Sequence, residues 1–437
     1  ADGPSNLPVP LTSLPRSTQV EPLPTGPMAP ENTAVTATSQ GVPLPWSKKH
    51  KQVTKASSGG LQFSLSNSFA QPLTSSELLQ LAKNRGDTDL VDLCHNHSLE
   101  YTPNGGSLDL REGIAHLYGP DITSANVLVF PGAQVVLPTV ARALVGGGTG
   151  HAISFSPGYQ SVVQAPAHVG GSLTTIPLSP TNGWQIDANE VEKAIRPGET
   201  RYIAINEPYN PAGTLMSSET QAELIALAMK HGLHIMCDEV YRLLEHDPSD
   251  QIMATADAYA KGISIVTLSK PWGACGVSIG WVATQDHGLL ESISDCQYFG
   301  CACPSRASEI QAMMVLRCSD WILDRNIRII RKNKELLGQF MAKHADLFTW
   351  VPPRAGAIAA IRFLGPLSSA ELGAELATEG IGIKPAYCFA DKISDEKDYF
   401  RVGFGEEKFP AALEALDAFV EKRKEGWLAD SWRLAAN

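Results

Sequence analysis

The chain has 437 residues, enough for two or three domains and a core so large that it needs no disulfide bonds. Lysine and arginine number 35 against 46 aspartate and glutamate residues, and the net charge of −11 argues against binding to nucleic-acid phosphates. Charged residues make up 19% and apolar residues 43% of the chain, which indicates a globular protein with much buried surface rather than a disordered one.

The first 58 residues are rich in proline, serine, threonine and glycine and show no hydrophobic period. This composition predicts a disordered tail. Four lysines near its end leave targeting to an organelle open, but no apolar signal-peptide core is present, so a solvated extension is the simpler interpretation.

Ordered structure is expected from about Leu61, and Thr74 with Glu77 forms the capping-box pattern that starts a first helix. From there, short apolar segments such as Val127–Phe130 alternate with helical periods, one of which begins at Gln134. This alternation is typical of a mainly parallel sheet with helices on both faces, an α/β three-layer sandwich.

The pattern changes beyond about Asp320. A long charged helix (Asp324–Lys343), strands near Ile358–Phe363 and Tyr399–Val402, and a final helix (Ala411–Arg423) are expected there. They predict a smaller α+β domain.

The eight cysteines lie mostly within apolar stretches, which is typical of reduced thiols in a cytoplasmic protein. Cys301 and Cys303 have a spacing that fits no common zinc site, so no metal is expected. No run of about 18 apolar residues is present, and no membrane span is predicted.

Polar residues follow the ends of three predicted strands. Asn210 lies in a turn after the strand that ends at Ile205, Asp238 and Tyr241 follow the next strand, and Lys270 closes a third. Because the carboxyl ends of parallel strands share one edge of a sheet, these side chains are expected in one crevice.

These residue types can act together. A partly desolvated lysine such as Lys270 can form a Schiff base, and a carboxylate such as Asp238 can keep a pyridine nitrogen protonated. Asn210 and Tyr241 can hydrogen-bond a phenolate oxygen, and Arg401, which comes much later in the chain, can bind the carboxylate of an amino acid.

From Leu61 to Lys424 the sequence resembles the fold-type I pyridoxal-phosphate enzymes, specifically the class I/II aminotransferases. The resemblance implies pyridoxal 5′-phosphate as cofactor, with Lys270 as its lysine and as the group that moves the substrate's α-proton. It also implies that Asp238 contacts the pyridine nitrogen and that Asn210 and Tyr241 contact O3′.

Further cofactor contacts follow from the same resemblance. They are the phosphate loop Gly132, Ala133 and Gln134, the stacking residue Tyr159, the hydroxyl of Thr267, and Tyr101, which would reach the phosphate of a neighbouring subunit. Sharing of Tyr101 implies a homodimer with a shared active site.

One position departs from the family pattern. The family has an arginine eight residues after the lysine, in contact with the phosphate, and this chain has Ser278 there. How the phosphate is held is therefore open, and so is whether the reaction is ordinary transamination.

The resemblance also divides the chain. It implies an N-terminal segment (residues 59–100) that contributes to the small domain and the active site, a large cofactor domain (101–318) and a small domain (319–437). Besides Arg401 and Asn210, the substrate contacts expected from the N-terminal segment are Asn67 and Phe69.

The predicted function is transfer of the amino group of an L-amino acid to a 2-oxo acid. The alternatives are elimination by a C–S lyase, cyclisation or oxidation of a basic amino acid, and a catalytically silent protein that binds a partner through its tail. The segment Gly276–Gly280 matches the G-x-S-x-G nucleophile elbow of hydrolases, but a strand at Ile279–Ala283, not a helix, is expected after the serine.

Overall fold

A seven-stranded sheet lies at the centre of the fold in the computed structural model, which describes residues 49, 61–147, 149–390 and 392–435. The strand order is β2-β8-β7-β6-β5-β3-β4, and only the pairs made by β8 are antiparallel. The strands are β2 (Val127–Phe130), β3 (His151–Ser156), β4 (Ser172–Pro177), β5 (Thr200–Asn206), β6 (His234–Asp238), β7 (Gly262–Thr267) and β8 (Gly280–Thr284). The predicted mainly parallel sheet is confirmed, whereas the predicted tail lies outside the described residues apart from Lys49.

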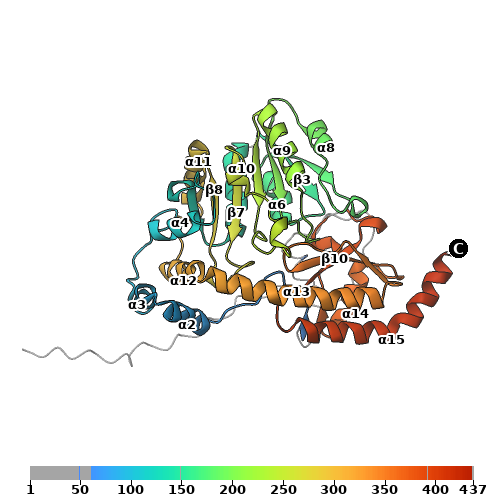
Figure 1. Ribbon diagram of the computed structural model, residues 1–437. Helices are drawn as coiled ribbons and strands as arrows, with labels where there is room; N and C mark the ends of the chain where they lie inside the picture. Colours follow the sequence, from blue (N-terminus) through green and yellow to red (C-terminus); the bar gives the residue numbers. More distant parts are fainter. Residues whose placement is uncertain (1–48, 50–60, 148, 391, 436–437) are drawn as a thin grey trace, which may run out of the picture. The chain divides into compact units, whose positions relative to one another are not determined.

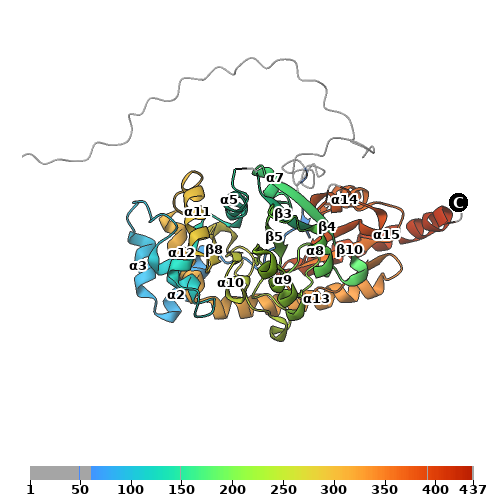
Figure 2. The same ribbon diagram turned by 90° about the horizontal axis from the view of Figure 1, so that it is seen from above.

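Helices cover both faces of this sheet, as Figures 1 and 2 show. In β7, Ile263 and Ile265 pack into the cluster that includes α5 and α11, whereas Val266 packs into the cluster on the other face that includes α12. Successive strand residues point to opposite faces, so an unbroken apolar strand supplies both cores. The helices around the sheet are α4 (Leu108–Ala115), α5 (Ala133–Val145), α6 (Gln160–Val163), α7 (Ala165–His168), α8 (Ala188–Ala194), α9 (Ser218–His231), α10 (Thr255–Ala258), α11 (His287–Tyr298) and α12 (Arg306–Arg317).

The first helix begins where the capping-box pattern predicts. In α2 (Ser75–Arg85), the Thr74 hydroxyl accepts a hydrogen bond from the Glu77 backbone N–H, and the Glu77 carboxylate accepts one from the Thr74 N–H. A second helix, α3 (Thr88–Asn96), follows it and packs on α12.

The smaller sheet has three antiparallel strands in the order β12-β10-β9. They are β9 (Phe348–Trp350), β10 (Ile358–Phe363) and β12 (Tyr399–Gly403), accompanied by α13 (Ser319–Lys343), α14 (Ser369–Thr378) and α15 (Phe409–Ala435). These elements match the predicted α+β pattern, but the last helix runs to Ala435 instead of ending at Arg423. Short 3-10 helices complete the fold at Ser124–Asn126, Pro180–Asn182, Pro248–Asp250, Cys275–Val277, Ala386–Cys388 and Asp395–Lys397.

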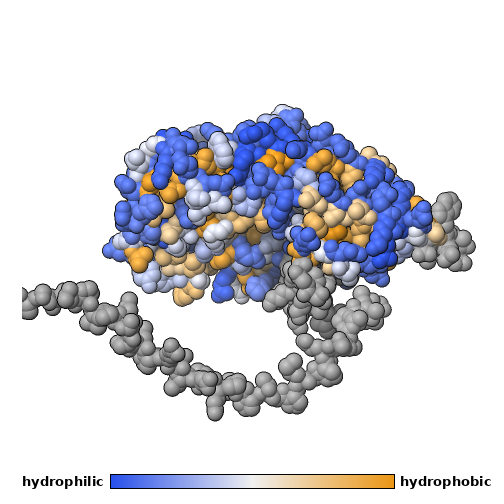
Figure 3. All heavy atoms as spheres, turned by 90° about the horizontal axis from the view of Figure 1, so that it is seen from below, coloured by the Kyte–Doolittle hydropathy of each residue, from blue (hydrophilic) through white to orange (hydrophobic). Residues whose placement is uncertain are grey.

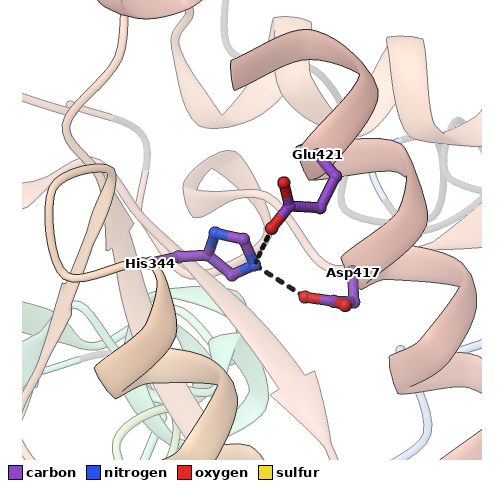
Figure 4. A group of neighbouring side chains, drawn as sticks. All are labelled: His344, Asp417 and Glu421. Carbon is purple, nitrogen blue, oxygen red and sulfur yellow. Dashed lines mark hydrogen bonds and ion pairs between the residues drawn. The ribbon is translucent and has the colours of Figure 1, made fainter. Parts of the chain in front are cut away.

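An ion-pair network joins the end of α13 to α15 (Figure 4). The Nε2 atom of the buried His344 lies 2.6 Å from Asp417 Oδ1 and 3.9 Å from Glu421 Oε1. The Nζ atom of Lys343 lies 2.7 Å from Asp417 and 3.0 Å from Glu421. Lys343 and His344 thus share both carboxylates, and the cluster links the end of α13 to α15.

The N-terminal segment begins in a separate two-stranded sheet and continues to the end of β7. Its β1 (Phe63–Ser64) pairs in parallel with β11 (Ile381–Gly382), and the Ala70 N–H donates to the Lys270 carbonyl at 3.1 Å. A Cβ atom at Gly403 would lie 1.6 Å from the Asn67 carbonyl oxygen, so only glycine allows the segment to approach β12 this closely. The described residues from Leu61 onward belong to one compact unit, and the domain boundaries near residues 100 and 318 stay predictions.

All eight cysteines are free. No helix of the described residues is long and apolar enough to cross a membrane. Figure 3 shows hydrophobic and hydrophilic residues interspersed on the face seen from below.

Candidate active site

A cavity of about 420 Å³ lies at the carboxyl ends of β5, β6 and β7. Most of the predicted site residues line it: Gly132, Ala133, Gln134, Tyr159, Asn210, Asp238, Tyr241, Thr267, Lys270, Ser278 and Arg401. The topology explains this meeting, because three neighbouring parallel strands end at the same edge of the sheet.

Lys270 follows β7 and points into the cavity, where its Nζ donates to the Ser68 hydroxyl at 3.1 Å. Burial, together with the nearby positive charge of Arg401, lowers the pKa of Lys270 to about 8. A lysine with this pKa has a substantial neutral fraction near neutral pH, which a nucleophilic amine requires.

Asp238 ends β6 and is 2% exposed. Burial raises its pKa to about 7, against the opposing effects of the Val240 N–H and the Lys270 charge. A cationic partner in the cavity would favour the carboxylate. Asp238 therefore fits the task of holding a protonated pyridine nitrogen.

Tyr241, three residues further on, is 1% exposed, and burial raises its pKa to about 12. Its hydroxyl therefore stays protonated at neutral pH and can donate a hydrogen bond to a phenolate oxygen.

Arg401 reaches the cavity from β12 and is almost fully buried. Its Nη1 donates to Asn210 Oδ1 at 3.0 Å and its Nη2 to the Ser66 carbonyl at 3.1 Å, while Nε has no hydrogen-bond partner. No carboxylate of the described residues pairs with it. A buried guanidinium that no acidic side chain compensates is suited to an anionic ligand.

Asn206 positions Asn210, a role that the sequence motif did not reveal. The Asn206 side chain donates to the Asp238 carbonyl at 2.7 Å and accepts from the Asn210 N–H at 2.8 Å. It therefore joins the ends of β5 and β6 and fixes the turn that directs Asn210 toward Arg401.

The expected phosphate end of the cavity is formed by the N-terminus of α5. Gly132 precedes this helix with φ +94°, and no side chain caps it, so its first N–H groups can bind an anion. The hydroxyls of Thr267, Ser269 and Ser278 line the cavity as well. These residues fit a phosphate held by helix N–H groups and hydroxyls.

The position that the family fills with arginine supplies only a hydroxyl. Ser278 Oγ lies 3.4 Å from the Pro131 carbonyl oxygen. Of the described residues that line the cavity, only Lys270, Lys384 and Arg401 are basic. None of these basic residues lies in the predicted phosphate loop (residues 132–134) or next to Ser278 in the chain.

Tyr159 lies against the same helix end. Its hydroxyl donates to Gln134 Oε1, which holds the half-buried ring at the cavity wall. Burial raises the pKa of Tyr159, so its hydroxyl stays protonated. The ring is positioned to cover a planar ligand.

Three predicted site residues do not line the cavity. Tyr101 is 96% exposed, and Asn67 donates to Glu406 Oε2 at 2.6 Å. Phe69 also lies outside the lining, whereas Ser68, between these two, belongs to it. Side chains of neighbouring residues in an extended chain point to opposite sides, which is why Ser68 lines the cavity and Asn67 and Phe69 do not.

Several residues that line the cavity were not predicted from the sequence, among them Ser68, Ser269, Cys275, Lys384 and Phe389. The alternation along residues 67–69 could have suggested Ser68. The pairing of Lys384 with Arg401 joins parts of the chain that show no common pattern, so nothing in the sequence indicated Lys384.

The segment that matches a hydrolase elbow is followed by strand β8, as expected. A nucleophile elbow requires a helix after the serine. Ser278 is therefore not placed as a hydrolase nucleophile.

A buried lysine and a buried carboxylate at the strand ends of such a sheet define the large domain of a fold-type I pyridoxal-phosphate enzyme. The chain belongs to the aminotransferase class I and II family, whose model matches residues 76–416. Membership implies pyridoxal 5′-phosphate as the cofactor. A solved PLP-dependent aminotransferase from Streptococcus suis is 25% identical, with a TM-score of 0.78 over 87% of this chain and 99% of that one.

Curated relatives include an aspartate aminotransferase of Thermotoga maritima, 28% identical over 52% of this chain. The arginine–pyruvate transaminase of Pseudomonas aeruginosa is 31% identical over 46% of this chain. The chain spans 61% and 52% of the lengths of these two relatives. Capreomycidine synthase of Streptomyces vinaceus is also similar, at 24% identity over 62% of this chain and 69% of its own length.

Proposed function

We propose that the protein is a pyridoxal-phosphate-dependent aminotransferase that moves the amino group of an L-amino acid to a 2-oxo acid. One observation carries the proposal: a lysine with a lowered pKa lines the same cavity as a buried arginine that no carboxylate of the described residues pairs with. The reaction requires the chain to supply an amine that can accept and donate a proton and a cationic group that binds a carboxylate.

The cofactor, when bound, supplies an electron sink that stabilises negative charge at the substrate's α-carbon. Asp238 would hold the charge on the ring nitrogen, and the α5 N-terminus with the hydroxyls would hold the phosphate. Arg401 binds the substrate carboxylate and so sets the position of the α-carbon. Lys270, neutral in part because of its burial, takes the proton from the α-carbon of the amino acid and, in the second half of the reaction, gives a proton to the α-carbon of the 2-oxo acid.

Cofactor binding is tested by the visible absorption of the purified protein after incubation with pyridoxal phosphate. We expect a band that borohydride removes and that Lys270→Ala lacks. Lys193→Ala is the matched control, because Lys193 lies exposed on α8 and pairs with Glu190. A protein that takes up no cofactor would overturn the proposal.

The reaction itself is tested by product analysis with a panel of amino acids and one 2-oxo acid. Transamination converts the added 2-oxo acid to its amino acid in equal amount to the substrate consumed. Ser278 and the similarity to capreomycidine synthase favour a second candidate, elimination or cyclisation at the same site. Ammonia release or a cyclic product without an acceptor would support that candidate instead.

We further propose a homodimer in which Tyr101 contributes to the partner's cavity. Leu99, Tyr101 and Phe299 are each more than 90% exposed, and hydrogen bonds from Thr102 and Gly105 hold their two segments side by side. Exposed apolar groups gathered in this way mark an interaction surface. Phe299→Asp should give a monomer in light scattering, whereas Met253→Asp, a change at an exposed methionine elsewhere, should leave the dimer intact.

A further inference from the structure

Ser278 lies beside the N-terminus of α5. It adopts the left-handed conformation, with φ +54°, at the end of the 3-10 helix Cys275–Val277, and β8 begins two residues later at Gly280. A Cβ atom at Gly280 would lie 2.5 Å from the Ala133 nitrogen, so only glycine lets β8 come this close to the start of α5. The same approach brings Ser278 Oγ to 3.7 Å from the place that a Cβ atom at Gly132 would take.

The three hydroxyls at this end of the cavity differ in how their hydrogens are used. The Thr267 hydroxyl donates to the Ile279 carbonyl at 3.0 Å, and Ser269 Oγ lies 3.2 Å from Thr267 Oγ1. Because a hydroxyl carries one hydrogen, Thr267 has none left for a ligand, and Ser269 is the donor within this pair. Ser278 Oγ lies 3.4 Å from its acceptor, the Pro131 carbonyl, which is long for a hydrogen bond between two oxygens. The Ser278 hydrogen is therefore the one most readily turned toward an anion.

The basic side chains that the described residues contribute to the cavity have their contacts at other places. Lys270 Nζ donates to the Ser68 hydroxyl at 3.1 Å, and Arg401 Nη1 donates to Asn210 Oδ1 at 3.0 Å. Lys384 forms a backbone bridge with Arg401, whose charge acts on it. Within the described part of the chain, the donors beside the α5 N-terminus are therefore neutral ones, namely the Ser278 hydroxyl and the first N–H groups of the helix.

We propose that Ser278 binds the cofactor phosphate as a neutral hydrogen-bond donor, together with the N–H groups at the start of α5, and that the cofactor exchanges with the solution as a result. A hydroxyl gives the phosphate one hydrogen bond, whereas an arginine at this position can give two and a full positive charge. This inference rests on the proposed function and adds a mode of regulation to it. The fraction of enzyme that is loaded follows the concentration of free pyridoxal phosphate.

The test measures the dissociation constants of pyridoxal phosphate and of pyridoxal, which lacks the phosphate, by titration of the cofactor-free protein and its absorption band. Ser278→Ala should weaken the binding of pyridoxal phosphate about tenfold or more, as loss of a hydrogen bond to a charged group does. Ser278→Arg should strengthen it about tenfold or more, and neither change should alter the binding of pyridoxal by more than about threefold. Ser292→Ala and Ser292→Arg, at an exposed serine of α11, are the matched controls and should leave both constants unchanged.

Unchanged binding of pyridoxal phosphate in Ser278→Ala would overturn the inference, because the hydroxyl would then not contact the phosphate. Equal binding in Ser278→Arg and the wild type would also overturn it, because the phosphate would then already have a cationic partner. Dialysis of the loaded wild-type protein decides the matter even if a variant does not fold: the absorption band should be lost, and its full retention would refute the exchange. Failure of the proposed function is recognised separately, since the wild type would then take up neither pyridoxal phosphate nor pyridoxal.

Discussion

Replacement of Arg401 by lysine tests the central role of the buried guanidinium while it keeps the positive charge. The wild-type side chain donates from Nη1 to Asn210 and from Nη2 to the Ser66 carbonyl, and each of these two nitrogens carries a second N–H. An ammonium group is a single point and cannot reach both acceptors and a substrate carboxylate together. The change therefore separates the effect of the planar guanidinium, with its several N–H donors, from the effect of its positive charge.

The size of the effect follows from the hydrogen bonds that are lost. A hydrogen bond to a charged group contributes about 1.5–3 kcal/mol. Loss of one or two of them in the enzyme–substrate complex corresponds to about 2–4 kcal/mol, or a fall in kcat/KM of about 30- to 1,000-fold. We expect this fall for every amino acid tested, because each carries the α-carboxylate.

The assay is steady-state kinetics, with the cofactor absorption band and the thermal midpoint as checks on folding. Arg362→Lys serves as the matched control, since Arg362 lies on the neighbouring strand β10 and does not line the cavity. A fall of less than about fivefold in Arg401→Lys would refute the reasoning. An equal fall in Arg362→Lys would assign the effect to the small sheet as a whole.

Three other predictions address the lysine, the stability of the fold and its dependence on pH. Ser68→Ala removes an acceptor that favours the charged form of Lys270, so the pKa of Lys270 should fall below about 8. The rate of cofactor loading should then reach its midpoint at lower pH; no shift, or an upward one, would contradict this role. Burial lowers the pKa of His246 to about 4, below its value of about 6.5 in the unfolded chain, so its protonation favours unfolding as pH falls through this interval. In urea unfolding, His246→Gln should lose less stability than the wild type between pH 7 and pH 4, by up to about 3 kcal/mol, and identical losses would count against the assignment. Gly403→Ala should destabilise the protein by about 2 kcal/mol or more, because its Cβ would meet a backbone carbonyl. Gly338→Ala, in α13 with open space around it, should stabilise it by about 0.5–1 kcal/mol; thermal melts that show the same sign for both would refute the steric argument.

The sequence by itself determined the class of fold and most of one wall of the site. Apolar segments such as β6 and β7 are buried on both faces, and this property shows directly in their composition. Asp238 and Lys270 come at the ends of these strands, and parallel strands bring their ends together whatever the loops between them do. These predictions needed only local pattern and a general rule of sheet topology.

Only the tertiary structure decided which residues of the N-terminal segment and of the small domain line the opposite side of the cavity. Which of residues 67–69 enters the cavity depends on the rotation of an extended segment, and that rotation is set by its backbone contacts with β12. The pairing of Lys384 with Arg401 depends on the register of two segments that lie 17 residues apart in the chain, from position 384 to position 401. No hydrophobic period or turn signal encodes such a register, because it results from the packing of the whole small domain.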